Sequence, residues 1–273
     1  MRDPLSPLDL GDLGAKVAGL IREAGDIALD FAREGARKWT KGDASIVTEA
    51  DIKVDSFLRE KLLALNPTIG WLSEETADTP ERLGFDRVWI VDPIDGTRAF
   101  VEGVPVWVIS IALVEHGRPV YGIVFNPTRD ELYEAYVGKG ATLNGAPIRA
   151  RAPVPLDGAE VVGPRAVMDD LDGSGVRLAR ASWVYALAYR LVSVAAGHVD
   201  AAIASTRAKD WDIAAADLIM HEAGATLVEI DGELPLYNQA SPVHPVLVGA
   251  PEPLNGALRS ALLKAARRPQ TWA

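Results

Sequence analysis

The sequence predicts a mixed α/β fold, on three observations. Amphipathic helical patterns come first, short β-branched and aromatic segments follow, and strand-like and helical segments alternate beyond residue 158. The chain has 273 residues, of which 48% are hydrophobic and 24% are charged, a balance typical of folded globular proteins. This length is ample for one large core or two small ones.

Two helices are predicted near the N-terminus. Apolar residues recur at helical spacing over residues 17–31 and again over residues 54–65. Thr48 and Asp51 have the spacing of a capping box, with Asp in place of Glu, at the start of the second helix. Asn66 and Pro67 end that helix.

An antiparallel meander is predicted next, because β-branched and aromatic residues fill short segments that end in tight turns. The strand-like segments are residues 88–91, 106–114, 119–125, 131–137 and 141–143. Residues 153–158 resemble a linker, which divides the chain into an N-terminal part, 1–152, and a C-terminal part, 153–273. In the second part, strands at 161–162, 199–204, 225–230 and 246–250 alternate with helices at 185–196, 212–223 and 254–266.

Composition excludes several classes of function. The 28 basic and 38 acidic residues give a net charge of −10, which disfavours binding to nucleic acids. The chain has no cysteine, so disulfides, thiolate metal sites and a cysteine nucleophile are excluded. No secretory signal is visible, and the longest apolar run, Val104–Val114, is broken by Pro105 and Ser110. We therefore expect a cytoplasmic protein that does not act at a membrane.

The most informative segment for function is Asp92-Pro-Ile-Asp95-Gly-Thr97, which follows an apolar strand. Asp92 and Asp95 offer hard oxygen ligands for a divalent cation. Gly96 lets backbone approach a ligand closely, and the start of a short helix over residues 98–102 offers N–H groups to an anion. Metal-assisted phosphate chemistry requires this combination. The alternative is that both carboxylates only cap a strand–helix turn.

Two further segments place carboxylates at similar positions. Glu74 and Glu75 follow the apolar strand-like residues 69–72, and a solvated acidic loop is the alternative there. Asp212 is predicted to be the N-cap of the helix that starts near Trp211, and a plain capping role is its alternative. If the three segments converge, their like charges repel, and a cation would offset the repulsion.

These motifs resemble the inositol monophosphatase family of Mg²⁺-dependent, lithium-sensitive phosphomonoesterases. The matching segments are Asp92–Thr97, Trp211-Asp212 with Glu222–Ala225, Glu74–Thr76, Val47–Asp51, and Gly138–Ala141 with Asn144-Gly145. The resemblance runs from about residue 15 to residue 266 and implies an α-β-α-β-α layered sandwich with the site between the two halves, often in a homodimer.

The resemblance also implies a role for each matched residue. Two or three Mg²⁺ ions would be held by Glu75, Asp92, the carbonyl of Ile94, Asp95 and Asp212. Glu75 would also help to place the attacking water, which Asp51 and Thr97 would orient. Asp95, Gly96 and Thr97 would face the phosphate ester. The implied reaction is in-line attack of a metal-activated water on phosphorus.

The substrate is less well specified by the sequence. Ser205 occupies a position at which many inositol-type members have a Glu, and Arg207 and Lys209 could meet a second phosphate or a carboxylate, unless they form only a solvated basic loop. Trp183 and Tyr185 could stack on a base or an imidazole, with a place in the core as the alternative. Lys41 is a further candidate that could reach the site from the loop at 38–43.

Several functions therefore remain open at this point. The sequence favours a phosphomonoesterase acting on an inositol monophosphate-like metabolite, with a 3′(2′),5′-bisphosphate nucleotidase and a histidinol-phosphate phosphatase as alternatives. A metal- and phosphate-binding regulator without turnover and a structural Ca²⁺ site are alternatives from other classes.

Overall fold

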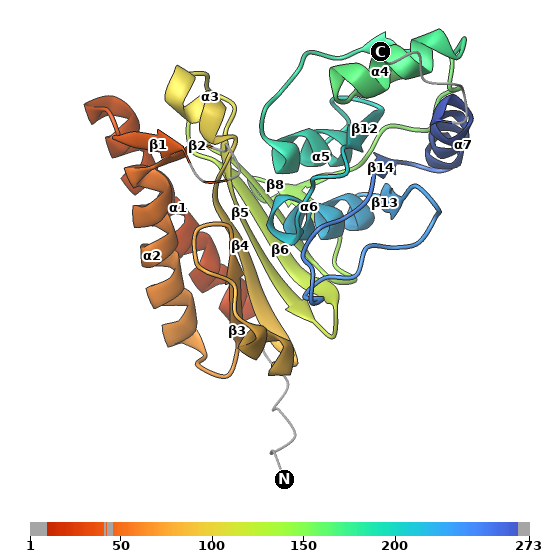
Figure 1. The fold of residues 1–273 in the computed structure, drawn as a ribbon. Coiled ribbons are helices and arrows are strands. Elements are labelled where there is room, and N and C mark those ends of the chain that lie inside the picture. The colour runs from red at the N-terminus through yellow and green to blue at the C-terminus, as the bar shows by residue number, and fades with distance from the viewer. Residues whose placement is uncertain (1–9, 41, 43–45, 267–273) are drawn as a thin grey trace.

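The structure is a computed structural model, and it describes residues 10–40, 42 and 46–266. Helices and sheets alternate in five layers (Figure 1), which confirms the expected α-β-α-β-α architecture. The helices are α1 (Leu10–Glu34), α2 (Glu49–Leu65), α3 (Thr97–Glu102), α4 (Arg165–Gly173), α5 (Leu187–Ala195), α6 (Asp210–Glu222) and α7 (Leu254–Ala266), with a 3₁₀ turn at Pro80–Gly84.

The larger sheet has seven strands in the order in which they occur along the chain. They are β3 (Gly70–Ser73), β4 (Arg87–Asp95), β5 (Val108–Glu115), β6 (Arg118–Asn126), β7 (Glu131–Tyr136), β8 (Ala141–Leu143) and β9 (Ala146–Ile148). Strands β4 to β8 form the predicted antiparallel meander and β9 extends it by one strand, whereas β3 pairs with β4 in parallel. A separate ribbon pairs β1 (Lys38–Thr40) with β2 (Ile46–Thr48).

The smaller sheet has five strands in the order β11-β10-β12-β14-β13. Their bounds are β10 (Glu160–Val162), β11 (Ala179–Arg180), β12 (Ala201–Ala204), β13 (Thr226–Glu229) and β14 (Leu247–Ala250). Helices α4 and α7 cover its outer face, and α5 and α6 fill the layer between the two sheets.

Side-chain alternation along β4 explains how one strand serves two cores. Val88 and Ile90 face the central layer with α5 and α6, whereas Trp89 and Val91 face α1 and α2. Because both faces are covered, the strand is buried from its second residue, Val88, to Asp95. The central core also joins residues from both sides of the segment at 153–158.

Helix α6 lies unusually close to the larger sheet. A Cβ at Gly122 of β6 would lie 2.6 Å from the carbonyl oxygen of Ala215, so only glycine allows this approach. The close contact fixes the height of α6 above the sheet, and therefore the position of the residues at its N-terminus.

The structure differs from the sequence prediction at several elements. Strands β1, β2, β9 and β11 and the 3₁₀ turn at Pro80–Gly84 were not predicted. Helix α4 was not predicted, because it is short and carries only two buried side chains, Met168 and Leu171. Helix α5 begins at Leu187, so the start predicted at residue 185 is too early. Helix α6 begins at Asp210, so Asp212 is its third residue and the predicted N-cap role for Asp212 is wrong. Within the described residues, no helix combines the length and apolar character needed to cross a membrane.

Candidate active site

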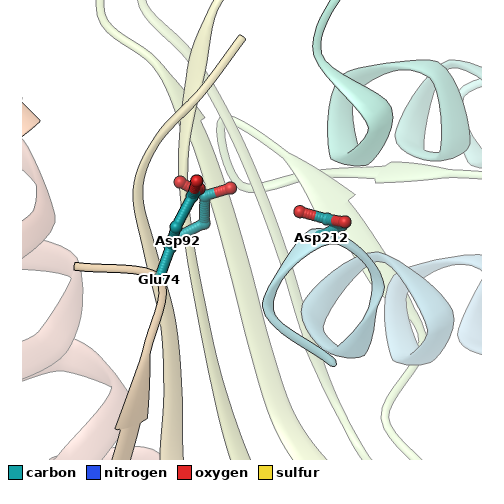
Figure 2. Close-up of side chains that lie close together, drawn as sticks. All are labelled: Glu74, Asp92 and Asp212. Atoms are coloured by element: carbon teal, nitrogen blue, oxygen red, sulfur yellow. The ribbon is translucent and has the colours of Figure 1, made fainter. Parts of the chain in front are cut away.

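The candidate site forms where β3 and β4 end side by side. Their parallel register sets Leu72 opposite Ile90 and Ser73 opposite Val91, and the Glu74 N–H donates to the Val91 carbonyl at 3.3 Å. Continuing this register by one residue places Glu74 beside Asp92, on the face that looks toward α6. Figure 2 shows the two carboxylates together at the strand ends.

Asp212 completes the group from the opposite side. Carboxylate oxygens of Glu74, Asp92 and Asp212 all lie within 4.8 Å of one another (Figure 2). Asp212 Oδ2 accepts the Lys209 N–H at 2.8 Å, which orients the side chain at the start of α6. We call Glu74, Asp92 and Asp212 the three-carboxylate group.

The start of α6 is itself anchored by a buried contact. Asp210 is fully buried, with Oδ1 2.8 Å from His244 Nε2 and Oδ2 accepting the Asn238 N–H at 2.7 Å. These bonds tie the segment between β13 and β14 to the N-terminus of α6. His244 therefore has a structural role.

Asp92 lies where β4 bends, three residues before the strand ends at Asp95. Its Oδ1 accepts the Ile94 N–H at 3.0 Å, and the ladder with β5 shifts register between Asp92 and Asp95. Asp92 is 1% exposed. Burial, followed by the charges of Glu74, Asp95, Asp212 and Asp51, raises the pKa of Asp92 well above its ordinary value.

The predicted capping box at the start of α2 is confirmed, and it aims Asp51 at the turn after β4. Asp51 Oδ2 accepts the Thr48 N–H at 2.8 Å, which leaves Oδ1 to accept a hydrogen bond from Thr97 Oγ1 at 3.0 Å. Thr97 Oγ1 also lies 3.1 Å from the Ile94 carbonyl. Burial raises the pKa of Asp51 to about 6.

Asp95 is tied to the helix across the site. Its Oδ1 accepts the Leu187 N–H at 3.0 Å and its Oδ2 accepts the Ala188 N–H at 2.6 Å, so it caps α5 from outside. Gly96 follows with φ +92°, and a Cβ there would lie 3.1 Å from the Ala186 Cβ. Asp95 lies outside the three-carboxylate group. Burial raises its pKa to about 7, although the two N–H bonds favour ionisation.

Glu75, which the sequence analysis assigned to the metal, is not part of this group. Along β3, Trp71 and Ser73 face α2, and Ser73 Oγ donates to Asp55 of that helix. The Glu75 N–H donates to Ser73 Oγ at 3.3 Å, within the loop on that side. Strand alternation gives Glu74 the face of Leu72, toward the central layer. The structure therefore favours Glu74 over Glu75, and the period of two along β3 is the signal that could have found it.

The predicted substrate-wall residues are spread around the site. Lys209 lies next to it, with Nζ 5.1 Å from the centre of the Trp211 ring. Ser205 is half-buried at the end of β12, and Arg207 is exposed. Trp183 is 48% exposed, so the core interpretation is wrong for it. Lys41 lies outside the described residues.

One residue of this wall was missed by the sequence analysis. Arg190 of α5 is 7% exposed, and its guanidinium lies 4.5 Å from the centre of the Trp183 ring. Its charge acts on Asp95 and Asp212. A lone arginine among the apolar residues of a predicted helix gives no local sign that its side chain is buried near acidic residues of the site.

The donor set fits a divalent cation of the hard type. Mg²⁺ prefers carboxylate, carbonyl and water oxygens, and the group offers three carboxylates beside the Ile94 carbonyl. Burial is also the main cause that raises the pKa of Asp212 well above its ordinary value, with Asp95 and Glu74 adding to it. A bound cation would favour the ionised form of each of these groups.

The raised pKa values predict how stability depends on pH. In the metal-free protein, Asp51 and Asp95, with pKa values of about 6 and about 7, bind protons more tightly than the unfolded chain does. The free energy of unfolding should therefore fall as pH rises from about 4 to about 7, and then level off as far as these groups are concerned. Mg²⁺ binds the ionised carboxylates, so its stabilising effect should grow over the same interval.

Thermal melting at a series of pH values, with EDTA and with saturating Mg²⁺, measures both trends. An increment in melting temperature caused by Mg²⁺ that is equal at about pH 5 and about pH 8 would contradict this account.

The comparisons with known proteins agree with this geometry. A family model described as the inositol monophosphatase family matches residues 11–268. The chain is 35% identical over 237 residues to the inositol-1-monophosphatase of Rhizobium meliloti (strain 1021), covering 81% of this chain and 86% of that protein. It is 37% identical over 204 residues to the histidinol-phosphatase of Mycobacterium tuberculosis, covering 71% and 77%.

Solved structures share the fold. The extragenic suppressor protein suhB of Bartonella henselae matches with a TM-score of 0.82 at 25% identity, covering 93% of this chain and 99% of that one. The IMPase of Thermotoga maritima matches with a TM-score of 0.80 at 26% identity, covering 91% and 95%.

Proposed function

The chain belongs to the inositol monophosphatase family, and from this premise we propose that it is a Mg²⁺-dependent phosphomonoesterase acting on a small phosphorylated metabolite such as an inositol monophosphate. Its family and its relatives make it a phosphoric monoester hydrolase. The observation that carries the proposal is the convergence of Glu74, Asp92 and Asp212 beside the Asp51–Thr97 hydrogen bond.

The proposed metal ligands follow the geometry. Glu74, Asp92 and the Ile94 carbonyl would hold one ion, and Asp92, Asp95 and Asp212 would hold a second, with Glu74 replacing the Glu75 of the sequence prediction. When bound, Mg²⁺ would neutralise the charge on the phosphate oxygens and lower the pKa of the attacking water.

The side chains around the turn after β4 carry the other steps. Thr97 Oγ1 lies between Asp51 Oδ1 and the Ile94 carbonyl, so the Thr97–Asp51 pair can hold a water by one hydrogen bond and accept its proton. The N–H groups of Gly96 and Thr97, at the start of α3, would donate to the phosphate.

A second candidate substrate carries a flat ring, and the half-exposed Trp183 favours it. The Trp183 ring lies edge-on to that of Tyr185, with centroids 6.5 Å apart. It also lines a cavity of about 490 Å³, together with Val161, Pro164 and Met168. Such a wall can stack on an imidazole or a base. Histidinol phosphate is therefore the second candidate, in agreement with the histidinol-phosphatase relatives.

A substrate panel separates these candidates. Phosphate release is measured with inositol 1-phosphate, histidinol phosphate and 3′-phosphoadenosine 5′-phosphate, with Mg²⁺ and with EDTA. We expect activity only with Mg²⁺ and the highest kcat/KM for inositol 1-phosphate. Under the second candidate, Trp183→Ala, assayed at saturating Mg²⁺, lowers kcat/KM for the ring-bearing esters and leaves kcat/KM for inositol 1-phosphate unchanged. Release of phosphate at full rate in EDTA would refute the metal-dependent proposal.

The resemblance also supports a homodimer in the cytoplasm, which we include in the proposal. Light scattering of the purified full chain measures the oligomeric state. A monomeric mass at the concentrations used in the assay would remove the dimer from the proposal and leave the reaction unaffected.

A further inference from the structure

Arg190 is a buried cation with few partners of its own. Its Nη1 donates to the Ile203 carbonyl at 3.3 Å, and its Nε has no hydrogen-bond partner among the described residues. Trp183 covers the guanidinium, with its ring centre 4.5 Å from Cζ. Burial lowers the pKa of Arg190 to about 10, so the side chain still carries its charge at neutral pH. Burial of a charge with so few hydrogen bonds reduces the free energy of unfolding, and core packing does not require a charged side chain at this position.

The charge of Arg190 is directed at one side of the acidic site. It attracts Asp95 and Asp212, whereas the pKa of Asp92 is raised first by burial and then by the negative charges of the other carboxylates. On the same side, the N-terminus of α5 donates the N–H groups of Leu187 and Ala188 to Asp95. The positive end of the helix and the guanidinium therefore both offset negative charge at Asp95.

The site is consequently unequal on its two sides. Asp92 is surrounded by the negative charges of Glu74, Asp95, Asp212 and Asp51, so a bound cation relieves the most repulsion beside Asp92. Asp212 belongs to the same three-carboxylate group, but the positive charges of Lys209 and Arg190 also act on it. The protein itself already compensates Asp95 in part, and Arg190 repels a cation that approaches Asp95 and Asp212.

We propose that Arg190 is a positioning residue that acts as a built-in counter-charge, stabilising the metal-free site and weakening the Mg²⁺ bound between Asp95 and Asp212 relative to the Mg²⁺ bound by Glu74 and Asp92. This inference rests on the proposed metal site. It makes occupancy of the second position dependent on the Mg²⁺ concentration, with Arg190 setting the concentration required.

Calorimetric Mg²⁺ titration of the full chain, without substrate, tests the inference. Arg190→Gln removes the charge and keeps a hydrogen-bond donor for the Ile203 carbonyl. We expect the dissociation constant of the weaker Mg²⁺ to fall roughly tenfold, the size expected on removing one partly screened unit charge from a buried cluster. Arg190→Lys keeps the charge and should restore the wild-type constant.

Melting curves provide the second readout. Arg190→Gln should lower the melting temperature of the metal-free protein more than that of the Mg²⁺-saturated protein, because bound Mg²⁺ takes over the role of the counter-charge. Arg33→Gln removes the same charge from an exposed position on α1 and is therefore the matched control. It should alter neither the melting temperatures nor the Mg²⁺ affinity. A purely structural role would lower both melting temperatures equally and leave Mg²⁺ affinity unchanged, which overturns the inference.

Trp183→Ser keeps the test decisive if Arg190→Gln does not fold. Trp183 is half-exposed, so its loss is tolerated more easily, and water then screens the Arg190 charge. Mg²⁺ affinity should rise in the same direction by a smaller factor, and unchanged affinity contradicts the inference. Wild-type protein that binds no Mg²⁺ would instead refute the proposed function, so the two failures are distinguishable.

Discussion

Asp92→Asn should reduce Mg²⁺-dependent phosphate release by about 10²- to 10³-fold or more, the range that loss of one preorganised charge-stabilising group produces. Asp92 is 1% exposed and is the member of the site proposed to serve both ions. The amide keeps the shape of the side chain and its Oδ1 can still accept the Ile94 N–H, so the change removes charge while the turn is retained. Initial rates over a series of Mg²⁺ concentrations measure the effect on kcat and on the Mg²⁺ requirement.

Two controls separate lost chemistry from lost folding. Metal-free Asp92→Asn should melt at a higher temperature than the metal-free wild type, because a buried repulsive charge is gone. Asp217→Asn changes another buried aspartate of the central layer, which accepts a hydrogen bond from Tyr237 Oη at 2.9 Å outside the site, and it should retain turnover wherever it is folded. Wild-type rates in Asp92→Asn would remove Asp92 from the mechanism.

Glu74→Gln and Glu75→Gln are a matched pair with opposite expected outcomes. The two residues are adjacent and both half-buried, and they differ in the side of β3 to which their side chains belong. Glu74→Gln should lower phosphate release by about 10²- to 10³-fold, because it removes a charge from the three-carboxylate group. Glu75→Gln should stay close to wild type.

The comparison is made with one substrate at saturating Mg²⁺ and again at limiting Mg²⁺, with circular dichroism to verify folding. The proposed ligand set requires Glu74→Gln to need more Mg²⁺ for half-maximal rate. A larger loss in Glu75→Gln than in Glu74→Gln would restore the assignment made from the sequence and reject the one made from the geometry.

The choice between Glu74 and Glu75 illustrates where sequence reasoning is weak. The sequence marks the segment after residues 69–72 as an acidic strand end, and the strand is there. Which of two neighbouring glutamates faces the site depends on the period of two along β3 and on its parallel register with β4. The apolar Leu72, two residues before Glu74, predicts which side chains of β3 share a face. The register between β3 and β4 can be known only from the folded structure.

The turn after β4 shows the opposite case. Local chemistry determines much of it, because Asp92 and Gly96 act within a few residues of their own backbone, and the capping box of Thr48 and Asp51 spans only one helical turn. Such local turns and caps, and the residues that form them, can be predicted from the sequence. The direction in which Asp51 points, toward Thr97, could be expected only from the family resemblance.

Arg190 could not have been identified from sequence at all. Its neighbours along α5 are apolar, and its relation to Asp95 and Asp212 arises from contacts between segments that are far apart in the chain. Trp183 was considered as a stacking residue, but its cover over Arg190 also depends on how the chain enters α5. Long-range electrostatics of this kind leaves no periodic pattern.

The absence of a side chain at Gly122 restricts the substitutions that this enzyme can accept in β6. Any larger residue there would displace the backbone of Ala215, one helical turn along from Asp212. The position of Asp212 at the start of α6 thus depends on the lack of a side chain at Gly122 in the sheet below. A larger side chain at Gly122 would therefore be expected to disturb the position of Asp212, although Gly122 lies on the sheet and carries no ligand group.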